Sequence, residues 1–231
     1  MDNFHAAHDA SLRRHLHALK ALRGDRRASP ARLNELKRWQ SARLAATYAD
    51  LSQQPRYHAA TRFFLHDLYG PKDFSHRDEA MMRILPAMSR LLPKSAVETA
   101  ALAIELEALS EELDHRVAAA LPAGPITEAS YAEANRRAVD RRERERQIDL
   151  TEAVGHRLDA LVRKPLVVRT LQLMRGPARA AGLSDLQDFL ERGFSSFRAM
   201  HGAGEFLATL RRRETAIIDE IYQDPVQART A

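Results

Sequence analysis

Apolar residues recur every three or four positions along almost the whole chain of 231 residues, and this spacing places them on one face of an α-helix. The clearest seam consists of Leu102, Leu106, Leu109, Leu113 and Val117. Alternation of apolar and polar residues, which is typical of a β-strand, never extends beyond a few positions. The pattern therefore predicts an all-α protein, a single bundle-like domain of about nine helices.

Capping residues, glycine and proline predict where the helices begin and end. The first helix is expected to end before Gly24, and Ser29 followed by Pro30 is typical of a helix start. A long helix is predicted from Thr127 to about Arg163, although its middle contains no apolar residue.

These boundaries divide the predicted domain into three groups of helices. The two helices at the N-terminus are expected to form an antiparallel hairpin, because only a short turn separates them. The predicted organisation is one helical domain over 1–222, with the hairpin at 1–53, middle helices at 54–121, C-terminal helices at 126–222 and a frayed tail at 223–231.

Positive charge is concentrated in the hairpin. The chain has 36 basic and 31 acidic residues, but residues 1–56 alone hold 11 basic and five acidic ones, so this quarter carries a net charge of +6. Such a patch favours contact with an acidic partner. We expect an interaction surface at Arg14, Arg27, Arg38 and Arg43.

The leucine seams of the hairpin suggest how this surface works. They are wide enough to pack on more than each other, so a homodimer formed through the hairpin is the preferred hypothesis. In the alternative, the hairpin packs on the rest of its own chain and the arginines are ordinary surface residues. The protein is accordingly expected to be a non-catalytic binding protein that forms homo-oligomers or binds an acidic protein, without a cofactor.

Composition excludes several classes of protein. Without cysteine there is no disulfide framework, zinc finger, iron–sulfur cluster or thiol nucleophile. The nine glycines build neither a P-loop nor a nucleophile elbow. No window of 18 apolar residues and no secretory signal is present, so we expect a cytoplasmic protein without a membrane partner.

The most distinctive segment is rich in phenylalanine and runs from Phe63 to Asp78, with the motif Phe-Phe-Leu-His-Asp-Leu-Tyr-Gly at its start. Through this motif the chain resembles a family of uncharacterised helical bacterial proteins with no known activity, so the resemblance implies no catalytic residues. On the helix before Gly70, three polar residues recur every four positions and share one side with a tyrosine. They are a candidate pocket: His58, Arg62, His66 and Tyr69.

A di-metal carboxylate site is an alternative. Glu112 and His115 form one Glu-x-x-His element, which resembles part of the site in ferritin-like proteins, where iron or manganese is held between helices. The chain has no second such element, which departs from that pattern. The complete candidate ligand set for a metal-dependent oxidoreductase is Glu105, Glu112, His115, Glu152 and His156.

Nucleic-acid binding is a further alternative, suggested by pairs of adjacent arginines throughout the chain. Trp39 and Tyr48 are the only aromatic residues within the second helix of the basic hairpin, too few for a platform on which bases stack. The charged stretch between residues 140 and 147 alternates in sign, which weakens its attraction for phosphate. This class is therefore possible but not favoured.

Overall fold

A computed structural model describes residues 14, 17–18, 21, 27–68 and 93–223. All regular structure in these ranges is helical, which confirms the all-α prediction. Most of the first predicted helix, residues 69–92 and the expected tail beyond Gln223 lie outside the described residues. The helices are α2 (Pro30–Thr47), α3 (Ala49–Gln53), α4 (Pro55–Phe63), the π-helical turn η1 (Phe64–Leu68), α6 (Lys94–Ala120), α7 (Glu128–Ala138), α8 (Arg141–Val162), α9 (Pro165–Leu173), α10 (Arg175–Ala180), α11 (Ser184–Ala199) and α12 (Gly204–Tyr222).

Local capping explains where several helices begin. The Ser29 side chain accepts a hydrogen bond of 3.2 Å from the backbone N–H of Arg32, and Pro30 follows as the first helical residue. The single long helix predicted from residue 127 to about 163 is wrong, because the chain breaks between α7 and α8. Asp140 accepts the Arg142 N–H and Glu143 accepts the Asp140 N–H, so the charged stretch begins a new helix with its own capping box.

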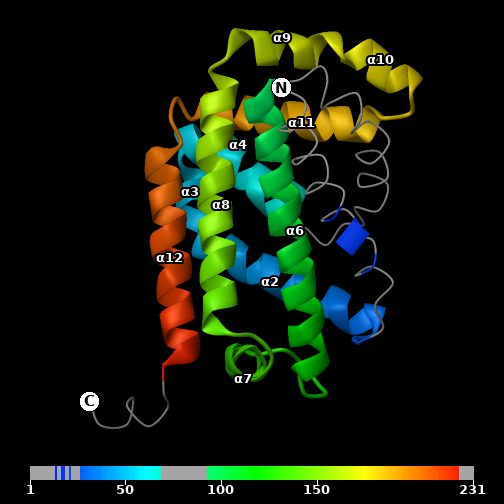
Figure 1. Ribbon diagram of the computed structural model, residues 1–231. Helices are drawn as coiled ribbons and strands as arrows, with labels where there is room; N and C mark the ends of the chain where they lie inside the picture. Colours follow the sequence, from blue (N-terminus) through cyan, green and yellow to red (C-terminus); the bar gives the residue numbers. More distant parts are fainter. Residues whose placement is uncertain (1–13, 15–16, 19–20, 22–26, 69–92, 224–231) are drawn as a thin grey trace.

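Three long helices, α6, α8 and α12, run side by side, and α2 crosses behind them (Figure 1). One apolar cluster lies among α3, α4, α11, α12 and the end of α8. A second lies among α2, α6, α7 and the end of α12. The α8 helix packs closely on α12, because Gly155 leaves room for the Leu207 side chain.

The second helix of the predicted hairpin packs on its own chain. Leu36 and Leu44, two members of its seam, are 0% and 4% exposed, and α2 contacts α6 directly. The seam is therefore covered within one molecule by the apolar face of the bundle. This arrangement agrees with the alternative in which the hairpin belongs to the body of the protein.

The segment after α8 leaves the bundle. The α9 and α10 helices lie across one end of the long helices, above α11 (Figure 1). A hydrogen bond of 2.7 Å from the Gln187 amide nitrogen to the Leu171 carbonyl oxygen holds α9 to α11. Arg175, the first residue of α10, donates hydrogen bonds of 2.6 and 2.7 Å to the two carboxylate oxygens of Glu191 on α11. These contacts hold both helices against α11.

Candidate functional site

The fold separates the four arginines of the predicted interaction surface. Arg14 and Arg38 are exposed. Arg27 instead donates hydrogen bonds of 2.7 Å to both carboxylate oxygens of Glu112 on α6. Arg43 lies against α12, with Nη2 3.5 Å from Glu214 and its Nε and Nη1 atoms buried. Arg43 is thus not a surface residue, because an acidic group of the same chain holds it in an interface.

The acidic face that meets the basic α2 helix belongs to α6. Lys37 donates hydrogen bonds of 3.0 and 2.7 Å to the two carboxylate oxygens of Glu111. One turn further along α2, the Gln40 amide donates a hydrogen bond of 2.9 Å to Asp114. Burial raises the pKa of Asp114 above its ordinary value, while the charges of Lys37 and Arg144 oppose the rise. Much of the positive charge of the basic N-terminal quarter is therefore paired with carboxylates of the same chain.

His115 is the most deeply buried of the candidate metal ligands, at 3% exposed. Neither ring nitrogen has a hydrogen-bond partner, and Nε2 lies 3.6 Å from Glu111. At the contacts of α8 with α6 and α7, other polar groups are engaged with one another: Arg144 donates to Asn135 and Gln147, and Gln147 donates to Ser110. His115 is buried and does not line the cavity found beside α9.

The three glutamates among the candidate metal ligands pair with three different arginines. Glu105 accepts a hydrogen bond of 2.7 Å from Arg146, and Glu152 accepts one of 2.6 Å from Arg211. His156 is 3.8 Å from Glu152, and Glu112 is held by Arg27. Within the described ranges, no group of three acidic or histidine side chains is placed to hold a metal ion. The fold does not bring the proposed ligand set together.

The candidate pocket before Gly70 is an exposed helix face. His58, Arg62 and His66 all face solvent, and the His58 Nδ1 atom is 2.7 Å from the Ser52 carbonyl oxygen. Tyr69 lies outside the described residues. None of these three described residues lines the cavity found beside α9.

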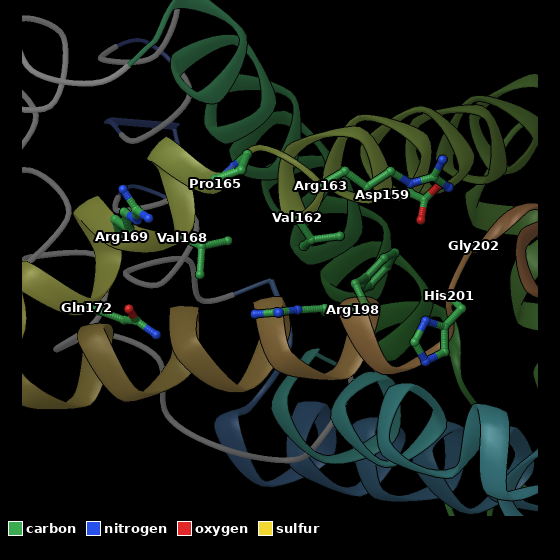
Figure 2. A pocket seen from close by; sticks show the side chains of 11 residues that line it. Asp159, Val162, Arg163, Pro165, Val168, Arg169, Gln172, Arg198, His201 and Gly202 are labelled. Carbon is green, nitrogen blue, oxygen red and sulfur yellow. The ribbon is translucent and has the colours of Figure 1, made fainter.

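That cavity, the α8–α11 pocket, has a volume of about 620 Å³ and opens between the end of α8, α9 and the end of α11 (Figure 2). Val162 and Phe197, which are 7% and 8% exposed, form part of its apolar lining. Three arginines stand around the opening: Arg163 at the end of α8, Arg169 on α9 and Arg198 on α11. The other polar lining residues are Asp159, Gln172 and His201.

The charges of the pocket are unequally satisfied. Arg163 is 2.5 Å from Asp159, whose other carboxylate oxygen accepts a hydrogen bond of 3.2 Å from the Ala203 N–H. Arg169 and Arg198 have no ion pair among the described residues, and both are exposed. Among the described lining residues, Arg163 is thus neutralised by Asp159, whereas Arg169 and Arg198 each contribute an unneutralised positive charge.

A tight turn positions His201 beside the arginines. His201 has φ of +52° and Gly202 has φ of +125°, the left-handed region that favours glycine. Arg56 supports this turn from α4, because its side chain donates to the carbonyl oxygens of Met200 and Gly202 at 2.9 and 3.3 Å. A non-glycine residue in this conformation is strained, and such strain is concentrated at functional sites.

The pocket was missed in the sequence because its arginines lie on three separate helices. One signal was present: residues 160–184 contain five basic residues and no acidic one. The larger excess of positive charge in the N-terminal quarter instead led to the prediction of an interaction surface there. A search for uninterrupted runs of one charge sign would have identified this segment.

The chain belongs to the family described as a domain of unknown function (DUF8198), which it matches over residues 19–228. Comparison with curated proteins and with solved structures gave no match. The family match confirms the resemblance to an uncharacterised family. No helix in the described ranges is long and apolar enough to span a lipid bilayer.

Proposed function

We propose that this family member is a non-catalytic binding protein whose binding site is the α8–α11 pocket, and that its ligand carries a phosphate or carboxylate group. The observation that carries the proposal is the convergence of Arg169 and Arg198, both without a carboxylate partner among the described residues, on one cavity. Several other arginines of the described chain are paired with carboxylates of the same molecule, as Arg27 is with Glu112 and Arg213 with Asp50.

Arginine suits this task for a physical reason. Its planar guanidinium presents five N–H donors and forms paired hydrogen bonds with carboxylate and phosphate oxygens. Two guanidinium groups on different helices approach a ligand from different directions, which adds orientation to charge. The apolar lining from Val162 and Phe197 favours a ligand with an apolar part attached to its anionic group.

The lining supports binding rather than catalysis. Among the described residues, the lining contains no serine, threonine, lysine or tyrosine that would act as a nucleophile. Asp159, the one carboxylate among these lining residues, is engaged by Arg163 and by the Ala203 N–H. A group already committed to two structural contacts is a poor general base.

Self-association through the hairpin is a second proposal. Its support is the exposure of Arg14 and Arg38, the two residues of the predicted surface for which no described residue supplies a carboxylate partner. Light scattering on the full chain tests it directly. A monomer at all concentrations contradicts it, and a dimer that dissociates in Arg38→Glu supports it.

Calorimetric titration with inorganic pyrophosphate tests the pocket. We expect saturable binding that weakens about 10-fold with Arg169→Ala and again with Arg198→Ala, since a hydrogen bond to a charged group contributes about 1.5–3 kcal/mol. Arg212→Ala is the matched control, because Arg212 is an exposed arginine on α12 outside the pocket. Equal loss in all three variants indicates unspecific charge attraction and rejects the site.

A further inference from the structure

The edge formed by α9 and α10 exposes large apolar side chains. Leu166 is 69% exposed, Leu173 is 78% exposed and Met174 is 40% exposed. Among the described residues only Leu68 is comparable, at 43%. We call Leu166, Leu173 and Met174 the α9–α10 apolar surface. Three such residues on one short segment require an explanation, because exposed apolar clusters mark interaction sites.

The spacing puts the two leucines on one side of α9. Leu166 and Leu173 are seven residues apart, close to two helical turns, and Met174 follows directly. Val167, which is 5% exposed, and Ala178 of α10, which is 6% exposed, are buried against the protein. The edge is therefore anchored by one set of apolar residues and presents a second set to solvent.

Positive charge surrounds the apolar surface. Lys164 donates a hydrogen bond of 3.0 Å to the Ser95 hydroxyl. Among the described residues, no carboxylate pairs with Lys164, Arg169 or Arg179. Arg175 is paired with Glu191. Apolar side chains surrounded by unneutralised basic residues are complementary to a surface that is anionic outside and apolar beneath.

We propose that the α9–α10 apolar surface docks on an anionic phospholipid bilayer. The leucines enter the boundary between headgroups and acyl chains, while Lys164, Arg169 and Arg179 contact lipid phosphates. The two helices lie across one end of the long helices (Figure 1), and their leucines are exposed to solvent there. A partner helix would instead dock in an apolar groove, whereas Leu166 and Leu173 are 69% and 78% exposed.

This inference differs from the expectation of no membrane partner, which rested on the missing 18-residue apolar window. That criterion concerns helices that cross a bilayer, whereas a helix lying in the interface needs only one apolar face. The inference also stands apart from the proposed pocket ligand. The two share Arg169, so the test relies on the leucines, which do not line the pocket.

Co-sedimentation with vesicles tests the inference on the full chain. We expect binding to phosphatidylcholine vesicles that contain about one-third phosphatidylserine, little binding to phosphatidylcholine alone, and weakening by salt. Leu166→Gln with Leu173→Gln should reduce binding at least about 10-fold, because insertion of the apolar side chains is lost. Leu68→Gln, an exposed leucine on η1, is the matched control and should bind as the unaltered chain does.

Three results overturn the inference: no binding to anionic vesicles, equal binding to neutral ones, or undiminished binding of the double variant. Capture of an acidic amphipathic peptide without vesicle binding also overturns it and assigns the surface to a protein partner. The double variant should still bind pyrophosphate. Loss of vesicle binding and loss of pyrophosphate binding thus test the two proposals separately.

Discussion

Arg27 and Glu112, 85 residues apart in the chain, are joined by two hydrogen bonds of 2.7 Å, one from each terminal guanidinium nitrogen to a separate carboxylate oxygen. This pair connects two interpretations of the sequence that seemed independent. Arg27 was a candidate for an interaction surface and Glu112 for a metal site, and each is instead the partner of the other. The pair ties the start of the described chain to α6.

Loss of this pair should have a small effect on stability. The two side chains are 43% and 33% exposed, so water and salt screen their attraction. Arg27→Ala and Glu112→Ala should each lower the free energy of unfolding by about 1 kcal/mol or less. Urea denaturation of both single variants and the double variant checks this. Effects that simply add would show that the two side chains do not interact in solution.

Gly155→Ala should destabilise the protein much more. A Cβ atom at this position would overlap Leu207 Cδ2, and Leu207 is 3% exposed, so its side chain has little room to move. We expect a loss of about 1–3 kcal/mol, the range for overpacked cores. Gly204→Ala is the control, because Gly204 is the first residue of α12 and, its chain neighbours apart, no atom of the described residues lies within 4 Å of its Cβ position. That helical change should be neutral or stabilise by up to about 1 kcal/mol.

Asp50 should titrate at unusually low pH. A hydrogen bond from Arg213 is the main cause that lowers the pKa of Asp50 from 3.8 to about 2. The folded pKa lies below the unfolded value, so the stabilisation is present above about pH 4 and is lost as the pH falls toward 2. Carboxyl NMR titration measures the shift. Arg213→Ala should return the pKa toward its ordinary value, and an unchanged pKa in that variant would disprove the assignment.

Asp114 should behave in the opposite sense. Burial raises its pKa in the folded state, so its contribution favours folding at low pH and declines as the pH rises through the folded pKa. Asp114→Asn keeps the shape and an oxygen that accepts from Gln40, but removes the charge. The free energy of unfolding of this variant should therefore increase relative to that of the unaltered protein as the pH rises. Denaturation curves across the acidic range measure this difference, and a difference that does not change with pH would refute the role of burial.

The local parts of the fold were predictable. Helical periodicity and capping residues act over a few positions, so the all-α class and the start of α2 at Ser29 and Pro30 followed from the sequence. The break at Asp140 was predictable in principle, because its capping box with Glu143 spans only four residues. It was overlooked because the stretch after it is uniformly polar.

The sequence by itself determined that the chain is helical, where many of its helices begin, and which chemistries its composition excludes. Only the tertiary structure decided which charges neutralise one another and which remain free. Periodicity predicts which face of a helix is apolar, but not which helix packs against it. The pairing of Arg27 with Glu112, and the position of Arg169 and Arg198 around one pocket, therefore came only from the tertiary structure. The physical reason is that ion pairing depends on distances between helices remote in sequence, and packing sets those distances.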